Sequence, residues 1–382
     1  MTKRQNIFYT NIVKRFLEGV IGIAIAVQYY RHHGTKVHGS TLNDETQGWY
    51  TALGLFLCKG ECKMEILLQV VLLVVGFVLL IKGADIFVDG ASKIATKLGI
   101  PMLVIGLTIV AMGTSLPEAA VSVSAALKGS ADIAVGNVLG SNILNVLLIL
   151  GVSASITPLA VQKCTIKYEI PITLGVTIIF AVLGLSNGAI YAWGGVLLWV
   201  LFLGYLGYLF WISKTGQVQE EPAPADNKKE NVLKLILFII IGVALIIVGS
   251  NISVEAAKKI AKAFGMSERL IGLTIVALGT SLPELVTSTI AAIRGKADIA
   301  IGNIIGSNIF NILFVIGTSA LITPVVYQSA FLFDSIVCAA STILLFVLVL
   351  NKKRKLNRIG GLLMLLAFAA YLCYLIPTSM AA

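Results

Sequence analysis

Charged residues are scarce in this sequence, at only 13% of its 382 residues. Soluble domains carry about 25% charged residues, so this chain has too few of them to cover a surface that faces water. Hydrophobic residues make up 57%, and the mean hydropathy is +0.93. Apolar runs of roughly 20 residues, the length that a helix needs to cross a bilayer, recur along the chain. The composition therefore excludes an ordinary soluble protein and predicts an all-α integral membrane protein.

Histidine and cysteine are also scarce. All three histidines (His32, His33 and His38) precede the apolar runs, which excludes a histidine metal site within the membrane. Cys58 and Cys62 form a lone C-x₃-C pair without further ligands, a weak sign of a metal site. The sequence also has no H-E-x-x-H motif, serine–histidine pair or phosphate-binding loop. We therefore expect neither an enzyme nor a resident cofactor.

The net charge of +10 comes from basic residues in short stretches between apolar segments. No basic patch with interleaved aromatic residues appears, which argues against nucleic-acid binding. Lys and Arg instead indicate topology, because loops on the cytoplasmic side are enriched in them. If Met64 is placed outside, most basic residues fall in loops that face the cytoplasm. The cluster from Lys258 to Arg269 opposes this assignment.

Ten apolar spans follow Met64, five on each side of a polar segment at residues 214–231. We expect residues 64–213 and 232–382 to form five helices each, with 214–231 as a cytoplasmic linker. The predicted spans are near 66–92, 102–127, 133–154, 170–186, 192–213, 233–260, 269–293, 299–321, 330–350 and 359–376.

The second half of the chain repeats the first. Gly106–Asn145 aligns with Gly272–Asn311 without a gap, and 27 of the 40 positions are identical. A repeat unit with an odd number of crossings lies upside down relative to its twin. We therefore predict ten transmembrane helices from two inverted five-helix repeats, the plan of secondary transporters, whose site lies at the repeat interface.

Residues 1–63 differ from the rest, because they are more polar and begin with a basic stretch. The apolar run Phe16–Tyr30 resembles a signal anchor, although Glu18 interrupts it and no clear cleavage site follows. The alternative is that Met64 is the true start. We expect an N-terminal extension here and assign it no function.

Two carboxylates lie within apolar spans. Glu118 and Glu284 each end the peptide Gly-Thr-Ser-Leu-Pro-Glu. A charge at this depth costs at least about 2.5–3.5 kcal/mol, so two acids at equivalent positions indicate function. The alternative is a structural pairing with a basic residue, for which only Lys82 lies near.

The same peptide explains how a cation is held. Pro117 and Pro283 have no N–H, so the carbonyls four residues earlier lose their donor and the helix breaks. Freed carbonyls are tolerated in a membrane where they line a cavity or meet a ligand. The preceding hydroxyls, Thr114, Ser115, Thr280 and Ser281, supply further oxygen atoms. Simple helix packing at a Gly–Pro kink is the alternative.

A second repeated element, Gly-Asn-x-x-Gly-Ser-Asn-Ile-x-Asn, contributes polar side chains spaced i, i+4. These are Ser141 and Asn145 in the first half, and Ser307 and Asn311 in the second. The other asparagines, Asn137, Asn142, Asn303 and Asn308, are expected to cap broken helix ends. Asp132 and Asp298 open the following spans; we expect helix N-caps, and the alternative is an acidic vestibule.

All of these donors are oxygen atoms, which hard cations such as Ca²⁺ prefer. Two carboxylates neutralise one Ca²⁺, or two Na⁺ ions with neutral donors available for another. Such a site takes either load but not both, which is the physical basis of exchange.

These motifs resemble the α-repeats of the sodium/calcium exchanger branch of the Ca²⁺/cation antiporter superfamily, in its compact prokaryotic form. The resemblance runs from about Met64 to the C-terminus. It implies ten helices, the first and sixth of which slide as gates. It also implies an ion site made by Thr114, Ser115, Glu118, Ser141, Asn145, Thr280, Ser281, Glu284 and Ser307.

We add Asn311 to this set. Some members, including potassium-dependent ones, carry aspartate at that position, so Asn311 removes a charge and argues against K⁺ co-transport. The short central linker also leaves no room for a large Ca²⁺-sensing domain.

The sequence thus predicts an antiporter that exchanges Ca²⁺ for Na⁺ across a cell membrane, the bacterial inner membrane in a prokaryote. A Ca²⁺/H⁺ antiporter is the alternative, and a passive cation channel is a third hypothesis. No protein partner is evident. The sequence does not define the stoichiometry, transport direction, affinity or oligomeric state.

Overall fold

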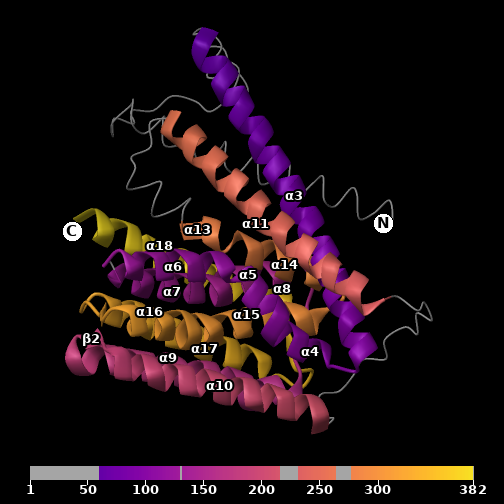
Figure 1. Ribbon diagram of the computed structural model, residues 1–382, viewed down its shortest axis with the longest axis vertical. Helices are drawn as coiled ribbons and strands as arrows, with labels where there is room; N and C mark the ends of the chain where they lie inside the picture. The colour runs from indigo at the N-terminus through magenta and orange to yellow at the C-terminus, as the bar shows by residue number, and fades with distance from the viewer. Residues whose placement is uncertain (1–59, 130, 216–230, 264–276, 382) are drawn as a thin grey trace, which may run out of the picture. The chain divides into compact units, whose positions relative to one another are not determined.

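The computed structural model describes residues 60–129, 131–215, 231–263 and 277–381 (Figure 1). Almost all of the predicted N-terminal extension and linker lie outside these ranges. The chain divides into two compact units, each described here by itself. The first unit is residues 1–78 with 251–276, and the second is residues 79–250 with 277–382.

The described part of the first half of the chain is almost entirely helical, with short π-helical turns (η) inside or at the start of several helices. Its elements are α3 (Gly60–Leu98), α4 (Met102–Ile105), η1 (Gly106–Val110), α5 (Ala111–Thr114), α6 (Leu116–Leu127), α7 (Asp132–Leu144), η2 (Asn145–Leu150), α8 (Gly151–Ile156), β1 (Leu159–Ala160), η3 (Thr165–Glu169), α9 (Ile170–Asn187), β2 (Ala189–Ile190) and α10 (Ala192–Thr215).

The described part of the second half has the same order of elements, except that the regular helix α17 takes the place of η3 and α9. They are α11 (Val232–Ala263), α13 (Ala277–Thr280), α14 (Leu282–Ile293), α15 (Ala297–Phe310), η5 (Asn311–Ile316), α16 (Gly317–Ile322), β3 (Val325–Val326), α17 (Phe331–Val349), β4 (Lys355–Leu356) and α18 (Arg358–Ala381).

The sequence repeat is therefore also a structural repeat. The helices α6 and α14 begin and end at equivalent residues of the aligned halves, and so do η2 and η5. The strands follow the same rule, because β1 corresponds to β3 and β2 to β4. Antiparallel pairs form between β1 and β4 and between β2 and β3, so each half supplies one strand to each pair. A twofold relation between the halves produces this reciprocal pairing.

The fold is that of a helical membrane protein. Among the described residues, eight helices are long and apolar enough to cross a membrane. A bent pair, Met102–Thr114 with Leu116–Leu127, passes the same test when its two helices are taken together, and it brings the number to nine if the pair is one span. The predicted span near 269–293 is described only from residue 277 onward, where α14 is a shorter apolar helix. The count of ten helices and their inverted arrangement remain predictions.

The predicted helix breaks are present. The chain bends by 50° between α5 and α6, at Ser115, and Pro117 lies in the first turn of α6. Ser281 separates α13 from α14 in the same way, with φ −90° and ψ 6°. The Gly279 carbonyl, which Pro283 cannot bond, accepts a 3.0 Å hydrogen bond from Ser250 Oγ. Each break therefore places its glutamate in the first turn of a new helix.

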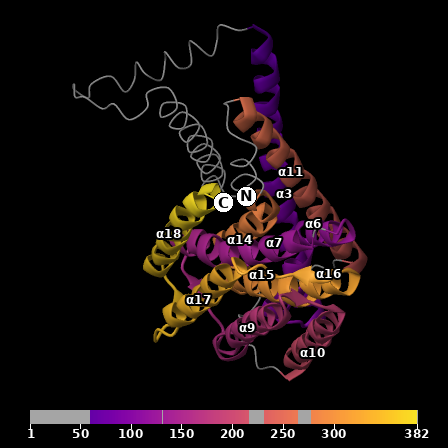
Figure 2. The same cartoon turned by 90° about the vertical axis from the view of Figure 1, so that its left-hand side faces the viewer.

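Within the second unit, α15 is a deeply buried helix that contacts η1, α14 and α9 (Figures 1 and 2). Two glycines allow η1 to approach. A Cβ atom on Gly302 would lie 2.9 Å from the Leu103 carbonyl oxygen, and one on Gly306 would lie 2.6 Å from that of Leu107. Contacts this short exclude any side chain, so these two glycines are what allows the close approach. The equivalent Gly140 has open space around it.

The expected helix caps are wrong where the structure describes them. Lys296 is the N-cap of α15, and no side chain caps this helix. Asp298 lies one residue inside α15 and accepts a 2.9 Å hydrogen bond from Gln162 Nε2. The residue before α7 is Ala131, so Asp132 is not the N-cap there either. Contacts between distant segments determine these positions, and a local motif does not reveal them.

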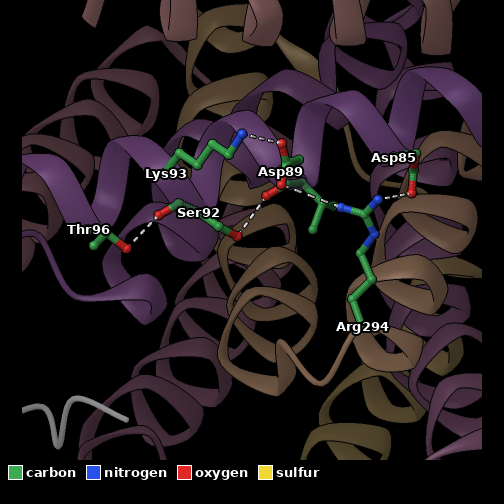
Figure 3. A network of polar contacts seen from close by, with 7 residues as sticks. Asp85, Asp89, Ser92, Lys93, Thr96 and Arg294 are labelled. Atoms are coloured by element: carbon green, nitrogen blue, oxygen red, sulfur yellow. Dashed lines mark hydrogen bonds and ion pairs between the residues drawn. The ribbon is translucent and has the colours of Figure 1, made fainter. Parts of the chain in front are cut away.

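An ion-pair network joins α3 to the end of α14. Arg294, which follows α14, pairs with Asp85 and lies 3.8 Å from Asp89 (Figure 3). Lys93 also pairs with Asp89, at 3.1 Å. The side chains of Arg294 and Asp85 are only 23% and 20% exposed, so water screens their attraction less than at an open surface.

We expect this pair to stabilise the fold. Asp85→Asn and Arg294→Gln should each lower the free energy of unfolding, and the double variant should lose little more than either single one. A double-mutant cycle on equilibrium unfolding in detergent should give a coupling energy of about 0.5–3 kcal/mol. The control is Glu255→Gln, which breaks an exposed pair with Lys258, because such pairs contribute about 0.2–1 kcal/mol. Strictly additive losses at Asp85 and Arg294 would contradict the prediction.

Candidate ion-binding site

Glu118 and Glu284 lie in the first turns of α6 and α14, and each is only 1% exposed. A helix N-terminus carries a partial positive charge, which favours a carboxylate there. Within the described ranges, neither glutamate forms an ion pair with Lys or Arg, so a structural salt bridge does not explain them.

Serines hold the two carboxylates in a crossed arrangement. Ser115 Oγ donates to Glu284 Oε1 at 2.7 Å, and Ser281 Oγ donates to Glu118 Oε1 at 3.1 Å. Each serine comes from the helix break of one half and each acceptor from the other half. The two breaks therefore face one another, and both halves build a single site.

Four oxygen atoms of this site are buried and have no hydrogen-bond partner. They are Glu118 Oε2, Glu284 Oε2, Asn145 Oδ1 and Asn311 Oδ1. Buried polar atoms are nearly always hydrogen-bonded, and an exception needs an explanation such as an ion. The four form two equivalent pairs, one from each repeat. Their number, chemistry and lack of donors fit a hard cation as the substrate of this site.

The amide groups that present two of these oxygens form a closed network. Asn142 Nδ2 donates to the backbone carbonyl oxygen of Asn308 at 3.1 Å, and Asn308 Nδ2 donates to the backbone carbonyl oxygen of Asn142 at 3.2 Å. Asn145 Nδ2 donates to Asn308 Oδ1 at 3.0 Å, and Asn311 Nδ2 to Asn142 Oδ1 at 3.1 Å. Because their nitrogen atoms are held in this way, Asn145 and Asn311 keep their own oxygen atoms available.

Backbone geometry contributes to this placement. Asn145 begins the π-helical turn η2, and Asn311 begins the equivalent turn η5. Single π-helical turns within α-helices are rare and often occur at functional sites. Both turns therefore place the amides in an unusual segment of backbone in each half.

The other predicted site residues lie around this centre. Ser281 Oγ is 3.4 Å from Ser141 Oγ, and the Thr280 side chain interacts with the Glu118 carboxyl group. Thr114 and Ser307 are both buried and both interact with Glu284. Side-chain contacts thus join eight of the ten predicted residues within the second unit. The other two, Asn145 and Asn311, begin η2 and η5, which contact α14 and α6.

Sequence reasoning missed several positions. Asn142 and Asn308 do not cap helix ends; they bridge the two halves, a contact that no local pattern reveals. Asn303 bonds Ser288 Oγ at 2.9 Å and lies 3.0 Å from Thr114 Oγ1, so it positions a predicted ligand. Thr287 also carries a buried hydroxyl without a partner, one turn beyond Glu284. The presence of a threonine hydroxyl in this apolar helix is the sequence feature that could have identified Thr287.

A membrane protein with two repeats and a buried, oxygen-rich site between them has the architecture of a secondary transporter. Comparison with known proteins identifies the family. The model of the sodium/calcium exchanger protein family matches residues 68–211 and 234–376, so the chain belongs to this family.

Its relatives include bacterial membrane proteins. The chain is 44% identical over 317 residues to a putative antiporter, CaxA, of Alkalimonas amylolytica, covering 80% of this chain and 98% of that one. It is 42% identical over 267 residues to the inner membrane protein YrbG of Escherichia coli, covering 68% and 81%. The solved sodium-calcium exchanger NCX_Mj superposes with a TM-score of 0.70 at 35% identity, covering 81% and 99%. The chain is therefore a multi-pass membrane protein of the bacterial, compact type.

We expect Asn142→Ala to lower the affinity of the site without removing a direct ligand. The variant frees the Asn311 amide to rotate, and loss of such an orienting contact typically weakens metal binding about 10–100-fold. Calcium titration of the purified protein measures the effect, and Asn308→Ala should match it because the network is reciprocal. Asn187→Ala, at the exposed end of α9, is the control. Unchanged affinity in both network variants would contradict the positioning role.

Proposed function

We propose that this chain is a secondary active antiporter that exchanges Ca²⁺ for Na⁺ by alternating access. The observation that carries the proposal is the set of four buried oxygen atoms without partners, two carboxylate and two amide, contributed equally by both halves. In this proposal Thr114, Ser115, Ser141, Thr280, Ser281 and Ser307 complete the ion shell. The protein acts as a transporter, like its family members, and performs no chemistry on a substrate.

Charge balance determines which ions fit. Glu118 and Glu284 together carry two negative charges, which one Ca²⁺ or two Na⁺ ions neutralise. Asn145 and Asn311 add oxygen atoms without adding charge. A site with this charge is too weakly negative to hold both loads together, because the surplus positive charge would be buried. Binding of one ion therefore displaces the other.

The relatives support this assignment. Solved structures of NCX_Mj, the exchanger that this chain resembles, describe ion exchange and binding-site occlusion with Na⁺, Ca²⁺ or Sr²⁺. The reciprocal pairing of the halves supports a site that both sides of the membrane reach in turn. By the same resemblance, α3 and α11 are the helices that gate it.

A Ca²⁺/H⁺ antiporter is the second candidate, because buried carboxylates also hold protons. The similarity to sodium/calcium exchangers favours the sodium hypothesis. Amide oxygens, unlike carboxylates, do not carry protons, and the network keeps those of Asn145 and Asn311 available. They fit the binding of Ca²⁺, which both candidates share, so the counter-ion is what the uptake experiment tests.

The first test is calcium uptake into proteoliposomes under an imposed ion gradient. We expect an outward Na⁺ gradient to drive uptake of radioactive Ca²⁺, and a pH gradient alone to drive none. Replacing Na⁺ by choline should abolish uptake. Uptake driven by the pH gradient alone would overturn the sodium assignment, and flux without any counter-ion would indicate a channel.

The second test removes one carboxylate at a time. Glu118→Gln and Glu284→Gln should each reduce Na⁺-driven Ca²⁺ uptake to background, because one remaining carboxylate leaves a bound Ca²⁺ with a buried net charge. Both variants should insert and purify normally. Glu255→Gln is the matched control, since it makes the same chemical change at an exposed residue. Wild-type uptake in either site variant would remove that glutamate from the mechanism.

A further inference from the structure

A third buried carboxylate lies outside the exchange site. Glu169 ends the π-helical turn η3 and is 0% exposed. Its Oε1 accepts a 2.6 Å hydrogen bond from the Tyr208 hydroxyl of α10. Within the described ranges, no Lys or Arg forms an ion pair with it. The nearby Lys167 instead places its Nζ 4.9 Å from the centre of the Tyr168 ring. The charge of Glu169 is therefore not neutralised by a basic side chain.

Three polar atoms of this cluster are buried and have no hydrogen-bond partner. They are Glu169 Oε2, Thr165 Oγ1 and the Tyr205 hydroxyl. Thr165 lies in the same π-helical turn as Glu169, and the Tyr205 ring on α10 stacks against that of Tyr208, with 6.3 Å between the ring centres. A threonine in a helix usually bonds the carbonyl one turn earlier, as Thr173 does at 2.8 Å. The Thr165 side chain instead interacts with the Glu169 carboxyl group.

The second half of the chain provides an internal comparison. There, Asp334 near the start of α17 accepts a 2.9 Å hydrogen bond from the Tyr371 hydroxyl of α18. A carboxylate–tyrosine bond thus joins the last two helices of each repeat and explains the contact of Glu169 Oε1. In the second half, neither Asp334 nor Tyr371 has a buried atom without a partner. The three unpartnered atoms around Glu169 are therefore a feature of the first half alone.

We propose that Glu169, Thr165 and Tyr205 form a second cation site, separate from the exchange site, that binds one monovalent metal cation such as Na⁺. One carboxylate with neutral hydroxyl oxygens carries a single negative charge. A monovalent cation neutralises that charge, whereas a divalent ion would leave an unpaired positive charge in apolar surroundings. The ion would be bound by η3 and α10 together and would stabilise the contact between these elements.

The test measures Na⁺ binding in a protein that lacks the proposed exchange carboxylates. In the Glu118→Gln/Glu284→Gln variant, we expect Na⁺ to raise the melting temperature in a saturable way, relative to choline at equal ionic strength. Adding Glu169→Gln should abolish this response. Tyr205→Phe and Thr165→Val should each raise the half-saturating Na⁺ concentration about tenfold, as the loss of one ligand does. Because the exchange carboxylates are already absent, the result is independent of the proposed function.

The control is Asp334→Asn, which removes the tyrosine-bonded carboxylate between α17 and α18 of the other half and should leave the Na⁺ response unchanged. Should Glu169→Gln fail to fold, Tyr205→Phe tests the site alone, since it leaves the Tyr208 bond intact. A Na⁺ response that persists unchanged in Glu169→Gln, or in Tyr205→Phe, overturns the proposal. So does an infrared carbonyl band of a protonated acid that disappears in Glu169→Gln and does not respond to Na⁺.

Discussion

The rest of the structure depends on two buried carboxylates that no basic residue neutralises in the part of the chain that the structure describes. Glu118 and Glu284 are almost fully buried, and each is held by a serine of the opposite half. A lysine or arginine partner would stabilise them more simply, but it would also occupy the position of a cation. The helix breaks, the close glycine contacts of α15 and the amide network all serve to hold these acids in a defined geometry without such a partner.

The repeat explains which parts of the protein are symmetric. In the proposed antiporter, a site that faces each side of the membrane in turn needs equivalent ligands in both halves. The two glutamates, the serines, and the asparagines Asn145 and Asn311 obey this rule. The periphery does not. Asp85, which pairs with Arg294, corresponds to Asn251, and the cluster around Glu169 has no full counterpart. These peripheral side-chain contacts therefore differ between the halves, although the backbone elements of the two halves correspond.

The sequence was sufficient to predict the helical membrane fold, the repeat and the helix breaks, and it singled out ten residues, the two glutamates among them, whose role in ion binding stays a prediction. Each rests on composition, or on a motif whose chemistry is local, such as proline four residues after a carbonyl. The roles of Asn142, Asn308 and Asp298 were not predictable in this way. Their partners lie far away in the chain, and local pattern favoured the more common helix cap. Glu169 was overlooked because it lies at the edge of an apolar span, where a charge is ordinary.

The same constraint accounts for coupling, the property that separates an exchanger from a leak. When the proposed site is empty, two carboxylates face one another without water or a counter-ion, and the closed, empty state is unfavourable. A bound Ca²⁺, or its equivalent in Na⁺, removes that penalty and permits the site to close around its load. The neutral amides of Asn145 and Asn311 add ligand oxygen atoms without adding charge. The bound ions therefore still have to balance two negative charges. In the proposed antiporter, this electrostatic penalty on the empty site is the source of obligatory exchange.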